Sequence, residues 1–160
     1  MSIRKKPWNR VDLPVYSVSS KGITDNMHIC TYVSAVSMQP KRMMVALYAG
    51  TRTLANVTKS RHFVLQLLHE DQYRLVNQLG KLSGNNIDKI SRLQKRNLLS
   101  TWNNYFILKD ALAVMELQTI EIIPAGDHTM FLCDVISYKN LNEGKALTTR
   151  ILNEKGIIRI

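Results

Sequence analysis

The chain has 160 residues, of which 45% are hydrophobic, and 22 Lys and Arg against 12 Asp and Glu give it a formal net charge of +10. This length and composition predict one folded domain spanning residues 1–160 and exclude a disordered chain. No hydrophobic run approaches the roughly 20 residues that span a bilayer, and no signal-peptide core follows the basic start. We therefore expect a cytoplasmic protein with no membrane partner.

The positive charge leaves two kinds of partner open. Lys and Arg are scattered along the chain rather than gathered in one stripe with interleaved aromatic residues. Neither a helix-turn-helix spacing nor an RNP-like strand is visible. A basic protein can equally steer an anionic small ligand such as a phosphate ester, so the charge by itself does not separate the two.

The first elements predicted along the chain are strands. Residues 1–13 form a basic lead-in, and a short strand follows Pro14. The segment Thr24–Pro40 alternates small and hydroxyl residues with apolar ones, which predicts one strand with a polar face. That face belongs either to an ordinary solvated edge strand or to a strand along which a planar polar ligand lies. Residues 43–48 are continuously apolar and predict a strand covered on both faces.

Thr51, Arg52 and Thr53 stand between that strand and a predicted short helix. Thr51 is a good N-cap, and a helix start offers unpaired backbone N–H groups at its positive end. With an Arg and two hydroxyls there, the segment is either a cradle for a monophosphate or simply a helix cap.

The middle of the chain predicts a strand at residues 63–68 and a helix at 70–79 that stops at Gly80. Residues 81–104 predict a partly helical excursion that covers a site. The long strand 113–123 changes its apolar face from odd positions to even ones, which indicates a β-bulge.

His128 lies in a tight connection, residues 124–129, that leads into a strand at 130–138, and residues 147–152 predict a helix. The histidine is either an exposed loop residue or a group that projects over a ligand. Asp127 and His128 are adjacent and would point apart on a strand, so we do not expect a hydrolytic triad.

The two cysteines, Cys30 and Cys133, lie in strand-like runs without a CxxC motif or a His at metal-ligand spacing. This pattern favours buried free thiols in a reducing compartment over a disulfide, and it predicts no metal site.

Strands outnumber helices in this pattern and mostly follow one another directly. The fold class is therefore mainly β with helical insertions, arranged as a small, mostly antiparallel barrel. The sequence carries no Rossmann fingerprint, P-loop or nucleophile elbow.

Six segments in order resemble the flavin reductase-like family of FMN-binding split barrels, which includes the flavoredoxins. They are Asn26–Tyr32, Ala35–Ser37 with Pro40, Thr51–Thr53, Phe63–Leu68, Ser83–Gly84 with Asp88–Lys89, and Gly126–Phe131. The resemblance covers about Pro14 to Tyr138.

The resemblance implies a split β-barrel that forms a homodimer, with FMN near the subunit interface and no nucleic-acid partner. It implies that the strand matching Asn26 to Ser37 lines the isoalloxazine ring and ribityl chain, that Thr51, Arg52 and Thr53 hold the phosphate, and that Lys89 also contacts the cofactor. The cofactor-binding residues expected on that strand are Asn26, Ile29, Cys30, Thr31, Tyr32, Ala35, Val36 and Ser37.

His128 matches a histidine near the ring face where a nicotinamide stacks, and the resemblance implies that it both contacts the cofactor and has a catalytic role. The sequence departs from the family where Ile29, Cys30, Thr31 and Tyr32 replace a Thr-Ala or Thr-Val followed by two Ser. Two functions follow from the resemblance. One is an oxidoreductase that passes hydride from NADH or NADPH to FMN, and the other is a flavin-binding electron carrier with little reductase activity.

Overall fold

The computed structural model describes residues 6–160, so the first five residues of the predicted basic lead-in lie outside the described part. Its largest element is a seven-stranded sheet in which each pairing between neighbours is antiparallel. In sheet order the strands are β2 (Asn26–Cys30), β1 (Tyr16–Ser20), β5 (His62–Leu67), β8 (Ala113–Ala125), β9 (His128–Asn140), β4 (Lys41–Tyr48) and β3 (Val33–Met38). The predicted fold class, a mainly β, mostly antiparallel split barrel, is confirmed.

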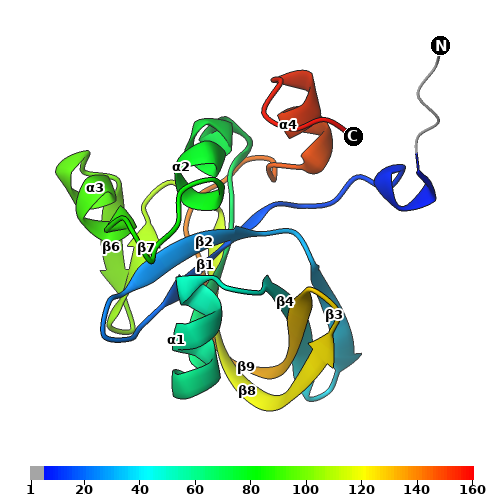
Figure 1. Cartoon of the computed structure of the whole chain (residues 1–160), viewed down its shortest axis with the longest axis vertical. Coiled ribbons are helices and arrows are strands. Elements are labelled where there is room, and N and C mark those ends of the chain that lie inside the picture. The colour runs from blue at the N-terminus through cyan, green and yellow to red at the C-terminus, as the bar shows by residue number, and fades with distance from the viewer. Residues whose placement is uncertain (1–5) are drawn as a thin grey trace.

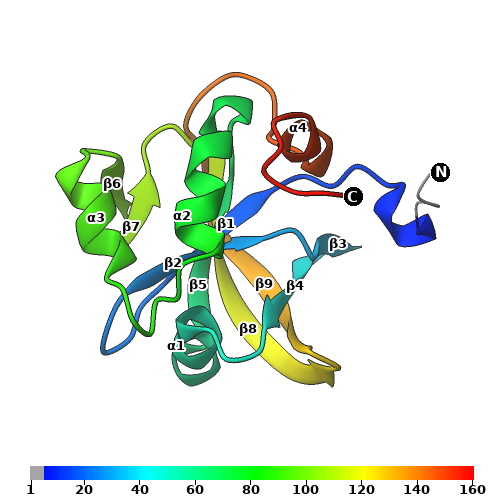
Figure 2. The same cartoon turned by 45° about the horizontal axis from the view of Figure 1, so that its top comes forward.

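The two edges of the sheet, β2 and β3, are consecutive in the sequence and are separated only by Thr31 and Tyr32. The sheet therefore curls until its edges approach each other, as Figures 1 and 2 show. Ala46 N–H of β4 donates to the Tyr32 carbonyl at 2.9 Å, but within residues 6–160 no ladder joins β2 to β3 or β4. The barrel is thus left open along this line.

The prediction of one strand over Thr24–Pro40 is wrong. The chain bends at Thr31 and Tyr32, where Val33 N–H donates to the Thr31 carbonyl at 3.0 Å. The half before the bend pairs with β1, and the half after it pairs with β4. Small and hydroxyl residues continue to alternate with apolar ones through the bend, and no Gly or Pro interrupts them, so the local sequence does not indicate the bend.

The bulge predicted in the long strand is confirmed. The register of β8 against β9 shifts between Glu116 and Leu117 and again between Thr119 and Glu121. At the first shift the extra residue, Ile136, belongs to β9. At the second shift Ile120 is the extra residue of β8, and it moves the side chains that follow to the opposite face, which accounts for the change of apolar face along the strand.

Apolar side chains fill the inside of the curled sheet. Phe63 and Phe131 meet there edge to face, with ring centroids 6.4 Å apart. Cys30 and Cys133 are buried in the same cluster and are free, as predicted. Burial raises the pKa of the Cys30 thiol to about 12, so this thiol stays protonated at neutral pH.

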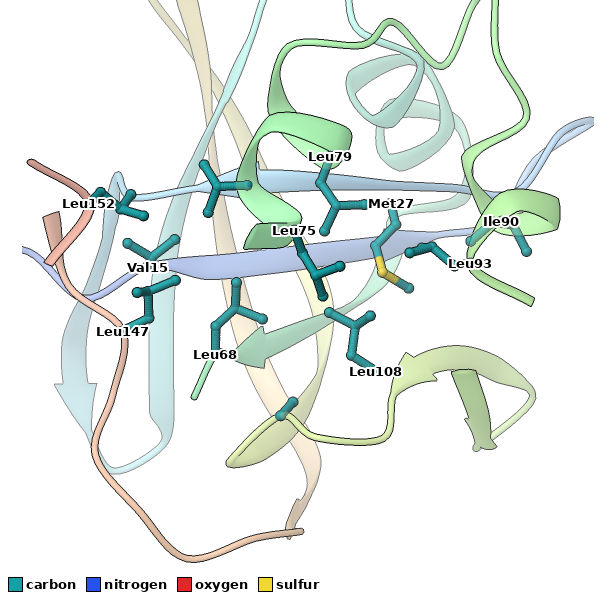
Figure 3. Close-up of a cluster of buried hydrophobic side chains, with 12 residues drawn as sticks. Val15, Met27, Leu68, Leu75, Leu79, Ile90, Leu93, Leu108, Leu147 and Leu152 are labelled. Carbon is teal, nitrogen blue, oxygen red and sulfur yellow. The ribbon is translucent and has the colours of Figure 1, made fainter. Parts of the chain in front are cut away.

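A second apolar cluster lies on the other side of β1 and β2, under a layer of helices. The elements of this layer are η2 (Glu70–Leu75), α2 (Val76–Gly80), α3 (Lys89–Lys95) and α4 (Thr149–Glu154). Figure 3 shows side chains from several of them around Met27 of β2. The helix predicted at 70–79 is therefore present, but its first half is a 3₁₀-helix.

The predicted excursion at 81–104 holds α3 and then the start of a hairpin, β6 (Leu99–Trp102) and β7 (Tyr105–Leu108). Asn103 and Asn104, which look like breaks in the sequence, form the hairpin turn with positive φ angles of 48° and 65°. Two further helices are η1 (Pro7–Asn9) and α1 (Arg52–Ser60). In the part of the chain that the structure describes, none of the helices has the length and hydrophobicity needed to cross a bilayer.

Candidate functional site

A cavity of about 270 Å³ opens where β2 separates from β4, and we call it the tyrosine cavity. Its walls come from the end of β2 and the bend after it, the end of β4, and the start of β9. It is lined by His28, Ile29, Cys30, Thr31, Tyr32, Ala46, Leu47, Tyr48 and His128. The open line of the barrel, rather than its interior, therefore forms the cavity.

Three rings meet in the tyrosine cavity. The His128 ring lies 4.9 Å from the Tyr32 ring and 5.3 Å from the Tyr48 ring, measured between centroids. Both tyrosines are about half exposed. Such a cluster offers flat apolar surface together with polar tips, which suits a planar heteroaromatic ligand.

Asp127 orients the His128 ring. Asp127 Oδ1 and His128 Nδ1 are 2.7 Å apart, so the expectation that these two side chains point apart is wrong. Asp127 lies in the turn between β8 and β9 rather than on the strand, and its side chain can fold back. With Nδ1 held by the carboxylate, His128 Nε2 is left for other contacts.

A second cavity of about 410 Å³ lies at the start of α1, and we call it the helix cavity. Its walls are the residues that lead into α1, Tyr48 to Arg52, and the loop Gly80–Gly84, with Asn26, His28 and Lys89 beneath them. His28 and Tyr48 line both cavities, so the two adjoin as one groove.

Hydrogen bonds hold the walls of the helix cavity together. Asn85 Nδ2 donates to the Gly50 carbonyl at 2.9 Å, which ties the loop after α2 to the start of α1. Asn26 Nδ2 donates to Thr53 Oγ1 at 2.9 Å and ties β2 to α1. A side chain on Gly84 would collide with the Asn26 amide, so only glycine allows the loop to lie this close.

Thr51 is the N-cap of α1, as predicted, because its Oγ1 accepts from Leu54 N–H at 3.1 Å. The same hydroxyl donates to the Tyr48 carbonyl at 2.9 Å. Its proton is therefore already engaged within the protein. Arg52 offers a free donor instead, since its Nε is buried without a hydrogen-bond partner among the described residues.

Lys89 places a buried ammonium group at the floor of the helix cavity. The residue is 3% exposed, and its Nζ donates to the Leu79 carbonyl at 2.7 Å and lies 3.5 Å from His28 Nδ1. No carboxylate of residues 6–160 lies within 4.0 Å of it. Burial lowers the pKa of Lys89 to about 8, and burial together with the neighbouring Lys89 charge lowers the pKa of His28 to about 4.

The structure brings most of the predicted site residues into this groove. Ile29, Cys30, Thr31, Tyr32 and His128 line the tyrosine cavity, and Asn26, Thr51, Arg52 and Lys89 line the helix cavity. Thr53 is fully buried behind the wall. Ala35, Val36 and Ser37 belong to β3 and line neither cavity.

The sequence did not point to His28 and Tyr48, which join the two cavities. His28 shares a strand face with Asn26 and Cys30 at a spacing of two residues, and this alternation was an available signal. Tyr48 ends an apolar run, where an aromatic residue looks like ordinary core. The loop Gly80–Gly84 falls largely within the predicted excursion that covers a site, but its place as a wall of the helix cavity depends on contacts with β2 and α1.

Residues 8–151 match the family described as Flavin reductase like domain. This match spans most of the chain. The protein belongs to the flavin reductase-like family. No curated protein sequence matches it.

Solved structures with the same fold share little sequence with this family member. The FMN-binding protein of Thermus thermophilus, solved with bound 1-cyclohex-2-enone, is 22% identical, with a TM-score of 0.74 over 88% of this chain and 80% of that one. The NADH:FAD oxidoreductase SgcE6 of Streptomyces globisporus is 16% identical, with a TM-score of 0.77 over 86% and 81%. Flavoredoxin of Methanosarcina acetivorans is 14% identical, with a TM-score of 0.73 over 88% and 73%.

Proposed function

We propose that this protein binds FMN in the groove and transfers hydride from NADH or NADPH to the flavin. One observation carries the proposal: the groove has a flat aromatic end, the tyrosine cavity, and a cationic end, the helix cavity. FMN has a matching arrangement, with a planar ring at one end for the aromatic end of the groove and an anionic phosphate at the other for the cationic end.

The helix cavity fits a phosphate. The Lys89 ammonium and Arg52 Nε are buried donors that lack an anionic partner within the described residues. Such groups are costly to bury unless an anion compensates them. The first turn of α1 adds backbone N–H groups with a positive end. Arg52, Lys89 and the start of α1 would hold the phosphate.

The tyrosine cavity fits the isoalloxazine ring. Tyr32, Tyr48 and the backbone of residues 28–32 would hold it, and His28, with its pKa lowered to about 4, stays neutral beside it. Bound FMN supplies an acceptor for the hydride of a reduced nicotinamide. The protein's part is to orient the two rings and exclude water.

His128 would act on the nicotinamide side of the cavity. Asp127 keeps its ring oriented, so Nε2 can donate or accept a hydrogen bond at one defined place. A positioned polar group of this kind lowers the barrier when its contact strengthens in the transition state. Among proteins with this fold, SgcE6 has also been solved with NAD and FAD fragments, which supports a nicotinamide partner here.

A flavin-binding electron carrier is the second candidate. Tyr32 packs against the His128 ring and is about half exposed at the cavity mouth. A ring in that position competes with nicotinamide for the same surface. If Tyr32 stays there when flavin binds, electrons would reach the flavin from another protein.

We also propose a homodimer that works in the cytoplasm. Val36 and Met38 of the edge strand β3 are 50% and 90% exposed, and β3 follows directly on the bend that lines the tyrosine cavity. A second copy covering this edge would bury them and complete the cavity. Ala35, Val36 and Ser37 would then meet the cofactor from across the interface. The buried free thiols agree with a reducing compartment.

Titration with FMN followed by NADH or NADPH tests the function. Binding of FMN with bleaching of its absorbance on addition of either nicotinamide supports the reductase. Binding without bleaching supports the carrier. A protein that takes up no FMN contradicts both.

A further inference from the structure

A third cavity, of about 560 Å³, lies between α1 and the loop that joins β1 to β2, and we call it the α1 cavity. The loop and the helix lie side by side in Figures 1 and 2. The volume falls in the range of small-molecule sites. Of the residues that line this cavity, only Arg52 also lines the groove, so the α1 cavity is a separate place on the molecule.

One face of α1 forms the first wall of the α1 cavity. Arg52, Ala55, Asn56 and Lys59 line it, and their spacing of three, four and seven residues places them on the same side of the helix. Arg52 and Lys59 are two turns apart, or about 10 Å along the axis. Ala55 lies between them, and its short side chain leaves the space between the two cations open.

The loop of residues 21–23 forms the second wall, and Asn56 fixes it in place. Asn56 Nδ2 donates to Ser20 Oγ at 3.1 Å and to the Thr24 carbonyl at 3.0 Å, so it holds both ends of the loop. A side chain on Gly22 would collide with the Asn56 amide. The Asp25 carboxylate accepts from Gly22 N–H at 3.3 Å and does not line the cavity. A ligand therefore meets a wall that is already ordered, which lowers the cost of binding.

The cations of the α1 cavity have no anionic partner. Neither Arg52 nor Lys59 lies within 4.0 Å of a carboxylate of residues 6–160, and no Asp or Glu of this part of the chain lines the cavity. Lys21 differs from them, because its Nζ lies over the Tyr105 ring, 4.8 Å from the centroid. Two unpaired positive charges on one wall favour an anionic ligand.

The second wall also offers an apolar surface. Ile23 is 96% exposed, more than any other large hydrophobic side chain of the described residues. It lines the cavity opposite the face that carries Ala55. An apolar group between Ile23 and Ala55 would remove both from water, and an acidic group on the same molecule would lie beside Lys59.

We propose that the α1 cavity binds a small organic anion that consists of an apolar ring or chain and one carboxylate or phosphate. Ile23 and Ala55 would hold the apolar part. Lys59 would pair with the acidic group, and Arg52 would add positive charge from the other end of the face. The site does not depend on the flavin, so this inference goes beyond the proposed function.

The test uses cinnamate and phenyl phosphate as probes of the two acidic groups. The protein is titrated as purified, and the methyl resonances of Ile23, assigned with Ile23→Val, are followed by NMR. Because an aromatic ring shifts the resonance of a methyl group that it covers, either probe should move the Ile23 signals, with a Kd of roughly millimolar. The probe that binds more tightly identifies the acidic group. Cinnamyl alcohol, which lacks the charge, and acetate, which lacks the ring, should bind more weakly.

Two variants remove the proposed contacts, and each has a matched control. Lys59→Gln should weaken probe binding about fivefold or more. Lys145→Gln removes the same charge from an exposed residue outside the cavity and should have no effect. Ala55→Phe should fill the space and abolish binding, whereas Thr58→Phe adds the same ring at an exposed position of α1 outside the cavity and should not. Ala55 is exposed, so the fold should tolerate the larger side chain, and equal melting temperatures check this.

Three results would overturn the inference. The first is that neither probe moves the Ile23 signals of the wild type. The second is that cinnamyl alcohol binds as well as cinnamate, or that Lys145→Gln weakens binding as much as Lys59→Gln. The third is that an oligoglutamate peptide moves the Ile23 signals while both probes leave them in place, which would assign this surface to an acidic protein partner. FMN takes no part in these measurements, so their outcome leaves the proposed function unchanged.

Discussion

Replacing Arg52 by Met tests the phosphate end of the groove most directly. The substitution keeps an unbranched side chain and removes the guanidinium, whose Nε is buried without a partner. Thr51 remains as the cap of α1. Its hydroxyl accepts from Leu54 N–H and donates to the Tyr48 carbonyl, and neither hydrogen bond involves Arg52. We therefore expect the unliganded protein to keep its melting temperature or gain slightly, since an unsatisfied buried donor is lost.

The magnitude for FMN follows from the donors lost. A hydrogen bond to a charged group contributes about 1.5 to 3 kcal/mol, and about 1.4 kcal/mol corresponds to a factor of ten. Losing one such bond from Arg52 should weaken FMN binding about ten- to 150-fold. Riboflavin lacks the phosphate and should bind the variant and wild type alike.

Flavin fluorescence titrations with FMN and riboflavin, on both proteins, measure this difference. Thr51→Ala is the matched control at the neighbouring position. It removes the cap and should cost about 1 kcal/mol of stability, or roughly 2 to 4 °C in melting temperature for a chain of this size. Because the Thr51 proton is engaged with Tyr48, FMN and riboflavin should respond equally to this control. Equal losses of FMN and riboflavin in Arg52→Met would refute a phosphate site at this place.

Three further predictions concern the ring end, the buried lysine and the assembly. His128→Ala should leave FMN affinity within a few-fold and slow flavin reduction by NAD(P)H about ten- to a thousandfold in stopped flow; an unchanged rate at equal flavin loading removes His128 from the mechanism. Since the pKa of Lys89 is lowered to about 8, its charge is present below that pH and lost above it, so FMN affinity should fall up to about tenfold per pH unit above pH 8. The Lys89→Met variant should bind FMN more weakly, with an affinity that does not change with pH. A wild-type affinity that stays constant up to about pH 9 would exclude Lys89 from the phosphate site. Light scattering should find a dimer at micromolar concentration, and Met38→Lys on the exposed edge strand should weaken it; a wild-type monomer that binds FMN tightly would contradict the shared site.

Features that depend on neighbours in the sequence were predictable. The Thr51 cap joins residues three apart, and the bulge of β8 follows from a change of face within one strand. Strand-like surroundings without a metal motif were enough to expect Cys30 and Cys133 as buried free thiols. The order of the short motifs also indicated the flavin reductase-like family, and the match over residues 8–151 confirms this prediction.

The tertiary structure decided where the groove lies. The bend at Thr31 and Tyr32 occurs because β2 pairs with β1 while β3 pairs with β4, and pairing partners are not encoded in local alternation. Lys89 meets His28 across 61 residues of sequence, and Asn85 meets Gly50 across 35. Residue types indicated which side chains are candidates for an anion site, whereas their convergence depends on how the sheet curls and where the helices pack, both of which are set by contacts between distant parts of the chain.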